Sequence, residues 1–342
     1  MTPSGQSTRL KHRLRDALDR AASWSGIQSA RERLSLGTLT ILTYHRVLED
    51  DAWARAPLQG LAMPRTAFAA QVEWLARTFV VEPLSAALAS LSRSEPCGRP
   101  LAAITFDDGH RDSAEIAAPI LERAAVRGTF FLVSDFVGSD RLLWFDCIAR
   151  WHAGSTEAAS RALLTRLGGQ WRTPGRPPLR PLLEALKSAP PEVRSECVWA
   201  AQREVGVSPE DRAMSVAQAR GLARAGHEIG AHSVSHPILT RVDDESLERE
   251  VVRCKDDVER LVGVPIRGYC YPNGSHDERV RGVARRAGYA YACTTHAARA
   301  RRQDDPFALP RFNMNVDQVT YPRGVFSERR LRAELARTDR RE

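Results

Sequence analysis

The chain contains 342 residues, enough for one large α/β barrel or for two domains of ordinary size. Apolar residues make up 43% of it and charged residues 27%, which excludes a disordered or fibrous chain. The net charge of +8 comes largely from arginines near the two ends. This charge favours anionic surfaces, but neither a nucleic-acid motif nor interleaved aromatic residues accompany it, so we expect no nucleic-acid partner.

Residues 1–36 form a basic N-terminal segment. Within it, Leu10, Leu14, Leu18 and Ala21 lie at helical spacing among basic side chains, which predicts a basic amphipathic helix. This helix either packs on the rest of the protein or makes peripheral contact with a membrane. Because no apolar leader and no bilayer-length apolar run is evident in the sequence, we expect a cytoplasmic protein.

The cysteines are scattered without CxxC spacing. They are Cys97, Cys147, Cys197, Cys254, Cys270 and Cys293. In a chain of this size, that pattern indicates small buried side chains in a reducing compartment and not a disulfide framework.

From residue 37 onward, short apolar runs alternate with helical patterns, which is typical of βα units that build a parallel sheet. The predicted strands are Thr38–Tyr44, Leu101–Phe106, Thr129–Val133, Glu228–Ala231, Gly268–Tyr271, Tyr291–Thr294 and Ala308–Phe312. Phe68–Phe79 and Leu247–Leu261 have helical periodicity, and Ser215 with Gln218 predicts a capping box.

Residues 134–214 break this rhythm, because prolines separate several helical pieces. We interpret them as a helical insertion or lid. The predicted organisation is therefore the N-terminal segment, an α/β domain over residues 37–320 with this insertion, and a charged tail over residues 321–342.

Two carboxylates follow the predicted strand Leu101–Phe106. Asp107 and Asp108 precede Gly109, at the strand end where parallel α/β folds place their active sites. Asp-Gly is also a common turn dipeptide, so this motif alone supports either interpretation.

Two histidines follow the predicted strand Glu228–Ala231. His232 and His236 lie four residues apart, but Pro237 disfavours a helix at His236 and no glutamate lies between the histidines. These features exclude the helical HExxH zinc site and predict a turn. Together, Asp108, His232 and His236 form a three-ligand set that leaves a coordination position open, as in catalytic sites for a divalent metal. Asp107 is then the candidate general base.

The sequence resembles carbohydrate esterase family 4, the polysaccharide deacetylases with a NodB-type domain. Thr105–Gly109 matches the family motif TFDDG, and His232–His236 matches H(S/T)xxH. Thr43–Val47, Tyr271–Gly274 and Leu309–Arg311 resemble segments of the bacterial exopolysaccharide branch, so the resemblance covers about residues 38–315.

The resemblance implies a distorted, incomplete (β/α)7-type barrel that hydrolyses N-acetyl groups of a saccharide. It implies Asp107 as the base, and Asp108, His232 and His236 as ligands of a divalent metal, usually Zn²⁺. It also implies that the turn at the end of the fifth predicted strand binds the substrate, and that one backbone N–H and the metal together stabilise the oxyanion. The residues of that turn are Tyr271, Pro272, Asn273 and Gly274.

The third family motif, RxPYG, differs in this chain, because Cys270 replaces its arginine and Asn273 its tyrosine. Asp107 therefore needs another donor to orient it. We expect Arg311, at the end of the last predicted strand, to supply it; the alternative is a structural surface arginine.

The family histidine that protonates the leaving amine is not identifiable in its leucine-x-histidine setting. By position, His45 is the first candidate and His296 the second, with His276 a further one, while His110 and His227 are expected to be structural. An N-acetylated saccharide is the expected substrate. Two alternatives stay open: hydrolysis of a non-carbohydrate amide, and a noncatalytic carbohydrate-binding barrel, against which the retained Asp107 argues.

Overall fold

A computed structural model describes residues 36–93, 98–321 and 324–336. The predicted amphipathic helix and most of the basic N-terminal segment lie outside these residues. The strands are β1 (Thr38–Tyr44), β2 (Arg46–Leu48), β3 (Ala62–Pro64), β4 (Val80–Val81), β5 (Leu101–Phe106), β6 (Thr129–Leu132), β7 (Glu228–Ala231), β8 (Gly268–Cys270), β9 (Tyr291–Cys293), β10 (Ala300–Arg301) and β11 (Phe312–Asn313).

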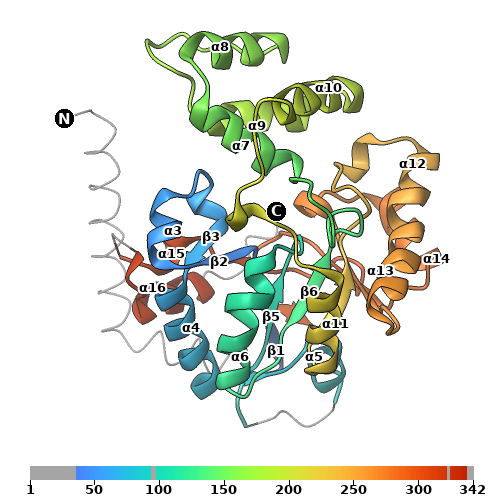
Figure 1. Cartoon of the computed structure of the whole chain (residues 1–342). Coiled ribbons are helices and arrows are strands. Elements are labelled where there is room, and N and C mark those ends of the chain that lie inside the picture. Colours follow the sequence, from blue (N-terminus) through green and yellow to red (C-terminus); the bar gives the residue numbers. More distant parts are fainter. Residues whose placement is uncertain (1–35, 94–97, 322–323, 337–342) are drawn as a thin grey trace.

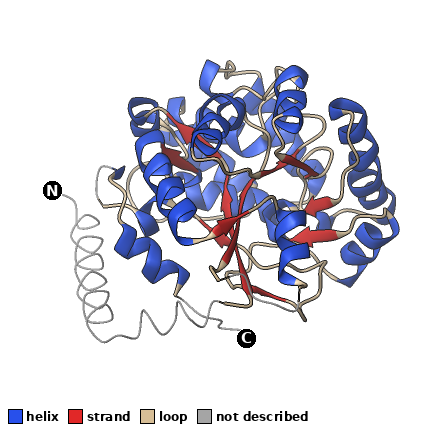
Figure 2. Cartoon of the chain, turned by 90° about the horizontal axis from the view of Figure 1, so that it is seen from below, coloured by secondary structure: helices blue, strands red, loops and turns tan. Residues whose placement is uncertain are grey.

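The main sheet is a curled parallel sheet in the order β1-β5-β6-β7-β8-β9, with β4 paired to β5 and β10 antiparallel to β1. One segment connects its two edges, because Leu309 bridges Cys293 of β9 and Phe312 pairs with Leu42 of β1. Strands lie at the centre and helices surround them (Figure 2). This confirms the predicted distorted, incomplete barrel.

Helices cover the outside of the sheet and one of its ends (Figure 1). The α-helices are α3 (Asp50–Arg55), α4 (Arg65–Thr78), α5 (Leu84–Leu91), α6 (Ala118–Arg123), α7 (Trp144–Gly154), α8 (Glu157–Arg166), α9 (Leu179–Ser188), α10 (Pro191–Gln202), α11 (Val216–Arg224), α12 (Asp244–Glu248), α13 (Cys254–Val262), α14 (Glu278–Arg286), α15 (Val316–Val319) and α16 (Glu328–Leu335). Short turns of other helix types are η1 (Gln59–Leu61), η2 (Ser113–Ala117), η3 (Pro209–Asp211), η4 (Leu239–Arg241), η5 (Arg249–Arg253) and η6 (Pro272–Gly274).

Six of the seven predicted strands agree with the structure to within one residue, and the capping box at Ser215 is present. The seventh, Ala308–Phe312, is wrong over most of its length, because only Phe312 of it lies in β11. Pro310 has no N–H to donate to a ladder, and the Arg311 N–H donates to the His296 carbonyl. The predicted helix Leu247–Leu261 contains the π-turn η5 between α12 and α13.

Alternation along the strands separates two apolar cores. Leu42 and Tyr44 of β1 face the surrounding helices, whereas Leu39 and Ile41 belong to an inner cluster that includes residues of α5. On β5 the same period continues through Ala103 to the position of Asp107. The strand pattern therefore directs this carboxylate into the barrel.

The insertion predicted over residues 134–214 contains α7 to α10, which lie together above the sheet (Figure 1). It has its own core, which includes Ile148 and Leu186, both fully buried. Two of its prolines stand at helix starts, since Pro178 is the N-cap residue of α9 and Pro191 is the first residue of α10.

The segment predicted as a charged tail is more ordered than its composition indicates. It contains α16, whose Leu331 and Leu335 are buried in the main core. The five cysteines of the described residues are free and buried, as expected, whereas Cys97 lies outside them. Among the described residues, no helix has the length and apolarity to cross a membrane.

Candidate active site

The two carboxylates lie where β5 ends. The Asp107 N–H donates to the Tyr44 carbonyl at 3.0 Å, which extends the pairing with β1 by one residue. The chain then turns, because Asp108 and Gly109 both have positive φ, 79° and 96°. A Cβ at Gly109 would approach the Val137 side chain to 3.0 Å, so glycine suits this turn. As a result, Asp107 and Asp108 face different partners.

The two histidines follow β7 in a turn that is not helical, as Pro237 predicts. Ser233 and His236 have φ values of 67° and 58°, and the Ser233 hydroxyl accepts a hydrogen bond from the His236 N–H at 2.9 Å. This turn brings the rings of His232 and His236 to 5.0 Å between centroids.

Asp108, His232 and His236 present one ligand atom each within 4.8 Å of one another. The Nε2 atoms of both histidines lie 3.5 Å from Asp108 Oδ1. Asp108 is fully buried, and neither of its carboxylate oxygens has a hydrogen-bond donor within the part of the chain that the structure describes. Buried carboxylates without donors are costly unless a cation compensates them, so these residues fit a divalent metal.

The surroundings orient the imidazoles. His232 Nδ1 lies 2.8 Å from the Cys270 carbonyl, which turns Nε2 toward Asp108. Burial lowers the pKa of His236 to about 3, so this ring is neutral, the form that binds metals. Burial acts to raise the pKa of Asp108, but the neighbouring histidines outweigh it and keep that pKa well below its usual range.

Arg311 contacts Asp107 through a two-pronged ion pair. Its Nη1 and Nη2 lie 2.8 and 2.7 Å from Asp107 Oδ1 and Oδ2. Thr105 Oγ1 and the Thr294 carbonyl accept further hydrogen bonds from the same guanidinium. Although burial acts to raise the pKa of Asp107, the charge and hydrogen bonds of Arg311 lower it to about 2.

Cys270 replaces the family arginine beside this pair. Its sulfur lies 2.9 Å from Arg311 Nη2 and 3.4 Å from Asp107 Oδ2. Asp107, His232 and Cys270 also lie close enough to share a metal. Burial, however, raises the pKa of the Cys270 thiol well above its usual value, and Arg311 already occupies both oxygens of Asp107. The Asp108 set is therefore the better metal site.

The histidines considered as general acid lie in different surroundings. His45 is half-buried between β1 and β2, and it lies close enough to act electrostatically on both Asp107 and Asp108, which places it near the site. His296 is exposed. His276 stacks on Tyr271, with ring centroids 5.0 Å apart.

The two histidines expected to be structural are buried and have polar partners. His110 Nε2 lies 2.8 Å from Asp146 of α7. His227 Nδ1 accepts a hydrogen bond from the Gly128 N–H at 3.0 Å.

The predicted substrate turn has one buried and one exposed side. Tyr271 is fully buried and its hydroxyl donates to the Phe307 carbonyl at 3.0 Å. Its side chain thus supports the turn from inside, and a ligand contact by this residue would require its backbone. Pro272 is buried as well, whereas Asn273 is exposed, with a φ of 56°. A Cβ on Gly274 would lie 2.1 Å from Thr295 Oγ1, so only glycine fits there.

Sequence reasoning missed the contacts between the insertion and the site. Phe145 of α7 packs edge-on against His236, with centroids 5.2 Å apart. Beside it, Asp146 contacts His110 as described above, and Arg46 of β2 pairs with Asp211 at 2.8 Å. The only sequence signal was that the insertion lies between the two ligand motifs.

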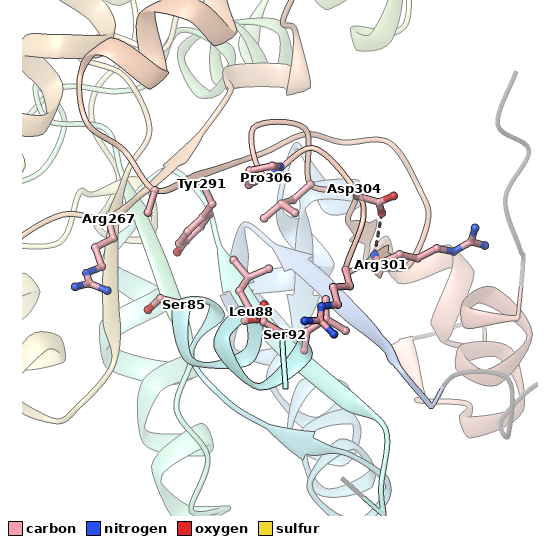
Figure 3. Close-up of a pocket in the computed structure, with 12 residues that line it drawn as sticks. Ser85, Leu88, Ser92, Arg267, Tyr291, Arg301, Asp304 and Pro306 are labelled. Atoms are coloured by element: carbon pink, nitrogen blue, oxygen red, sulfur yellow. Dashed lines mark hydrogen bonds between the residues drawn. The ribbon is translucent and has the colours of Figure 1, made fainter. Parts of the chain in front are cut away.

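A separate pocket of about 280 Å³ lies at the opposite end of the sheet, beside residues that precede β8 and β9. Figure 3 shows Arg267 and Arg301 on opposite sides of it, with Tyr291 between them. The Arg301 N–H donates to Asp304 at 2.8 Å. None of the predicted site residues lines this pocket.

Comparison with known proteins identifies the family. The family model described as "Polysaccharide deacetylase" matches residues 94–292, more than half of the chain. The chain therefore belongs to the polysaccharide deacetylases, a class of hydrolytic N-deacetylases. One curated relative, the uncharacterized protein YlxY of Bacillus subtilis, is 29% identical over 70 residues, which is 20% of this chain and 22% of YlxY.

Solved structures share the fold at low sequence identity. The Streptococcus pyogenes deacetylase PplD, in complex with acetate, is 16% identical with a TM-score of 0.55, over 81% of this chain and 92% of that one. IcaB from Ammonifex degensii is 17% identical with a TM-score of 0.54, over 82% and 93%. The deacetylase domain of BpsB from Bordetella bronchiseptica is 15% identical with a TM-score of 0.50, over 82% and 96%.

Proposed function

We propose that this protein removes N-acetyl groups from a saccharide, with Asp107 as general base beside a divalent metal held by Asp108, His232 and His236. The observation that carries the proposal is the pairing of two different carboxylates. Asp108 is buried, has no hydrogen-bond donor in the described ranges and faces two imidazoles, while the adjacent Asp107 is held by Arg311. A binding protein needs no such second carboxylate.

The metal is proposed to be Zn²⁺, because two imidazoles and one carboxylate are ligands that zinc accepts in catalytic sites. When bound, the ion supplies Lewis-acid polarisation of the acetamide carbonyl and of the attacking water.

The protein residues then handle protons and position the substrate. Asp107 accepts the proton of the attacking water, and Arg311 keeps this carboxylate ionised and oriented. The backbone N–H of the exposed Asn273 is the proposed donor to the carbonyl oxygen. His45 is the proposed acid that protonates the departing nitrogen, so the C–N bond breaks to give acetate and a free amino sugar.

An acetate assay on the full-length protein with added Zn²⁺ tests this function. N-acetylated oligosaccharides should yield acetate and free amine in equal amounts, whereas linear and cyclic amides without a sugar should react more slowly. Faster cleavage of a cyclic amide would favour the alternative hydrolase. Saccharide binding without acetate release would favour the noncatalytic barrel.

A further inference from the structure

A second feature of the site comes from the insertion and is not part of the ligand motifs. Helices α7 and α10 lie above the sheet (Figure 1), and together with Ser235 and His236 they line a pocket of about 580 Å³. Its wall thus includes a candidate metal ligand. A substrate bound at the metal would extend into this pocket.

Arg194 of α10 is the unusual residue of this pocket. It is only 9% exposed, and its guanidinium lies 5.8 Å from the centre of the Trp144 ring. Among the residues that the structure describes, this guanidinium has no hydrogen-bond acceptor and no ion pair. Burial lowers the pKa of Arg194 and the like charge of Arg241 lowers it further, and together they outweigh the opposite effect of Glu250. Apart from the Trp144 ring, this largely buried cation has no compensating group among the described residues, so its N–H groups are available to an anionic ligand in the pocket.

The carboxylates near Arg194 are engaged elsewhere. Glu250 accepts hydrogen bonds from the Val234 and Ser235 N–H groups at 2.9 Å each, and from the Ser235 hydroxyl at 2.7 Å. Glu196, on the pocket wall, pairs with Arg166 at 2.6 Å. Arg141, also on the wall, pairs with Asp135 at 3.7 Å. Among the charged residues that line the pocket, Arg194 is therefore the one whose charge no ion pair within the described residues compensates.

The pocket also offers surfaces suited to a sugar. Trp199 lines it and is 62% exposed, and apolar ring faces of this kind contact the C–H faces of sugars. The Trp144 indole N–H is buried and has no acceptor among the described residues. Aromatic walls and one convergent charge are features of small-molecule sites.

We propose that Arg194 binds an anionic group of the substrate, a carboxylate or a phosphate, so that the enzyme acts on N-acetylated saccharides that carry negative charge beside the reacting residue. This inference rests on the proposed deacetylation for its catalytic part. Guanidinium recognises both anions through charged hydrogen bonds, and the test separates them.

The test compares three substrates and three variants of the full-length protein. The substrates are a neutral N-acetylglucosamine oligomer, an oligomer of N-acetylglucosamine and glucuronate, and N-acetylglucosamine 1-phosphate. Arg194→Gln should lower kcat/KM for the preferred anionic substrate about 10- to 100-fold and leave the neutral one nearly unchanged. Arg194→Lys should retain part of the preference. Arg180→Gln is the matched control, because exposed Arg180 belongs to the insertion but does not line the pocket.

Binding supplies a readout that does not depend on turnover. Glucuronate and inorganic phosphate are titrated into each variant while tryptophan fluorescence is followed. Arg194→Gln should raise the dissociation constant of the preferred anion at least 10-fold, whereas Arg180→Gln should leave it unchanged. If anion binding depends on Arg194 but no substrate yields acetate, the result supports anion binding in this pocket and counts against deacetylation. If acetate is released efficiently without preference for anionic substrates, and Arg194→Gln binds the anions as the wild type does, the proposed role of Arg194 is wrong while the deacetylase function stands.

Discussion

Arg311 and Asp107 lie 204 residues apart in sequence, yet they form a fully buried two-pronged ion pair with N–O distances of 2.8 and 2.7 Å. The pair connects the segment that joins β9 and β1 to the end of β5. Cys270, at the position where the RxPYG motif has its arginine, contacts the same guanidinium, with its sulfur 2.9 Å from Arg311 Nη2.

The pair predicts a pH effect. Asp107 must be ionised to accept a proton, and Arg311 is what lowers its pKa to about 2 against the effect of burial. Arg311→Met removes the positive charge that lowers the pKa of Asp107, but the carboxylate stays buried. The pKa of Asp107 should therefore rise. The acidic limb of the kcat/KM profile should therefore move to higher pH, while metal content stays unchanged. A profile with an unmoved acidic limb in a folded variant would contradict this role.

Because the variant also leaves a buried carboxylate unpaired, we expect it to lose about 3–5 kcal/mol of stability.

In the family motif the arginine stands at the position of Cys270, whereas in this chain Arg311 contacts Asp107, and mutation can restore the family arrangement. Cys270→Arg alone would place two guanidinium groups beside one carboxylate in a fully buried site, so we expect loss of stability and activity. Adding Arg311→Ala removes the competing cation. The double variant should recover at least 10-fold in activity over Cys270→Arg, measured as acetate release. If the double variant is no better than the single one, the two arginines are not alternatives for the same task.

The ligand set predicts metal content. Purified protein should contain about one divalent ion per chain, and His232→Ala or His236→Ala should lose most of it, because two donors remain. Metal analysis after gel filtration measures this directly. His227→Ala is a matched control, since His227 is buried but bonds to Gly128 and not to Asp108. Equal metal content in all four proteins would contradict the assignment.

The insertion should behave as a packed unit. Leu186 of α9 is fully buried in its separate core, so Leu186→Ala should cost about 2–5 kcal/mol, measured by chemical unfolding. Its neighbour Leu183 is only partly buried, so Leu183→Ala should cost less. Equal small effects would indicate that this core is not formed.

Long buried strands were predictable, because β5 carries a nearly continuous apolar run and β1 combines apolar residues with β-branched threonines, and polar residues follow both strands. The two-residue strands β4 and β10 are too short to show any period, and they form only by pairing with β5 and β1. The turn of the histidine pair followed from Pro237.

Contacts that depend on tertiary packing could not be predicted in the same way. Arg311 was expected to reach Asp107 because it lies at the end of the last predicted strand and strand ends converge in a barrel; the contact is present although most of that predicted strand is not. No local pattern indicated that Asp146 would bind His110, or that Arg194 would line the same pocket as His236 without an ion pair among the described residues. Both follow from how the insertion folds back over the sheet.

The measurement that tests the central claim most directly is acetate release by Asp107→Asn at a metal content equal to that of the wild type. Asp107→Asn should retain its metal and lose about 10²- to 10⁴-fold in kcat, because the base is gone while the ligands Asp108, His232 and His236 remain. Asp108→Asn should weaken metal binding as well. Near-normal acetate release by metal-loaded Asp107→Asn, or loss of metal from Asp107→Asn with retention in Asp108→Asn, would contradict the account.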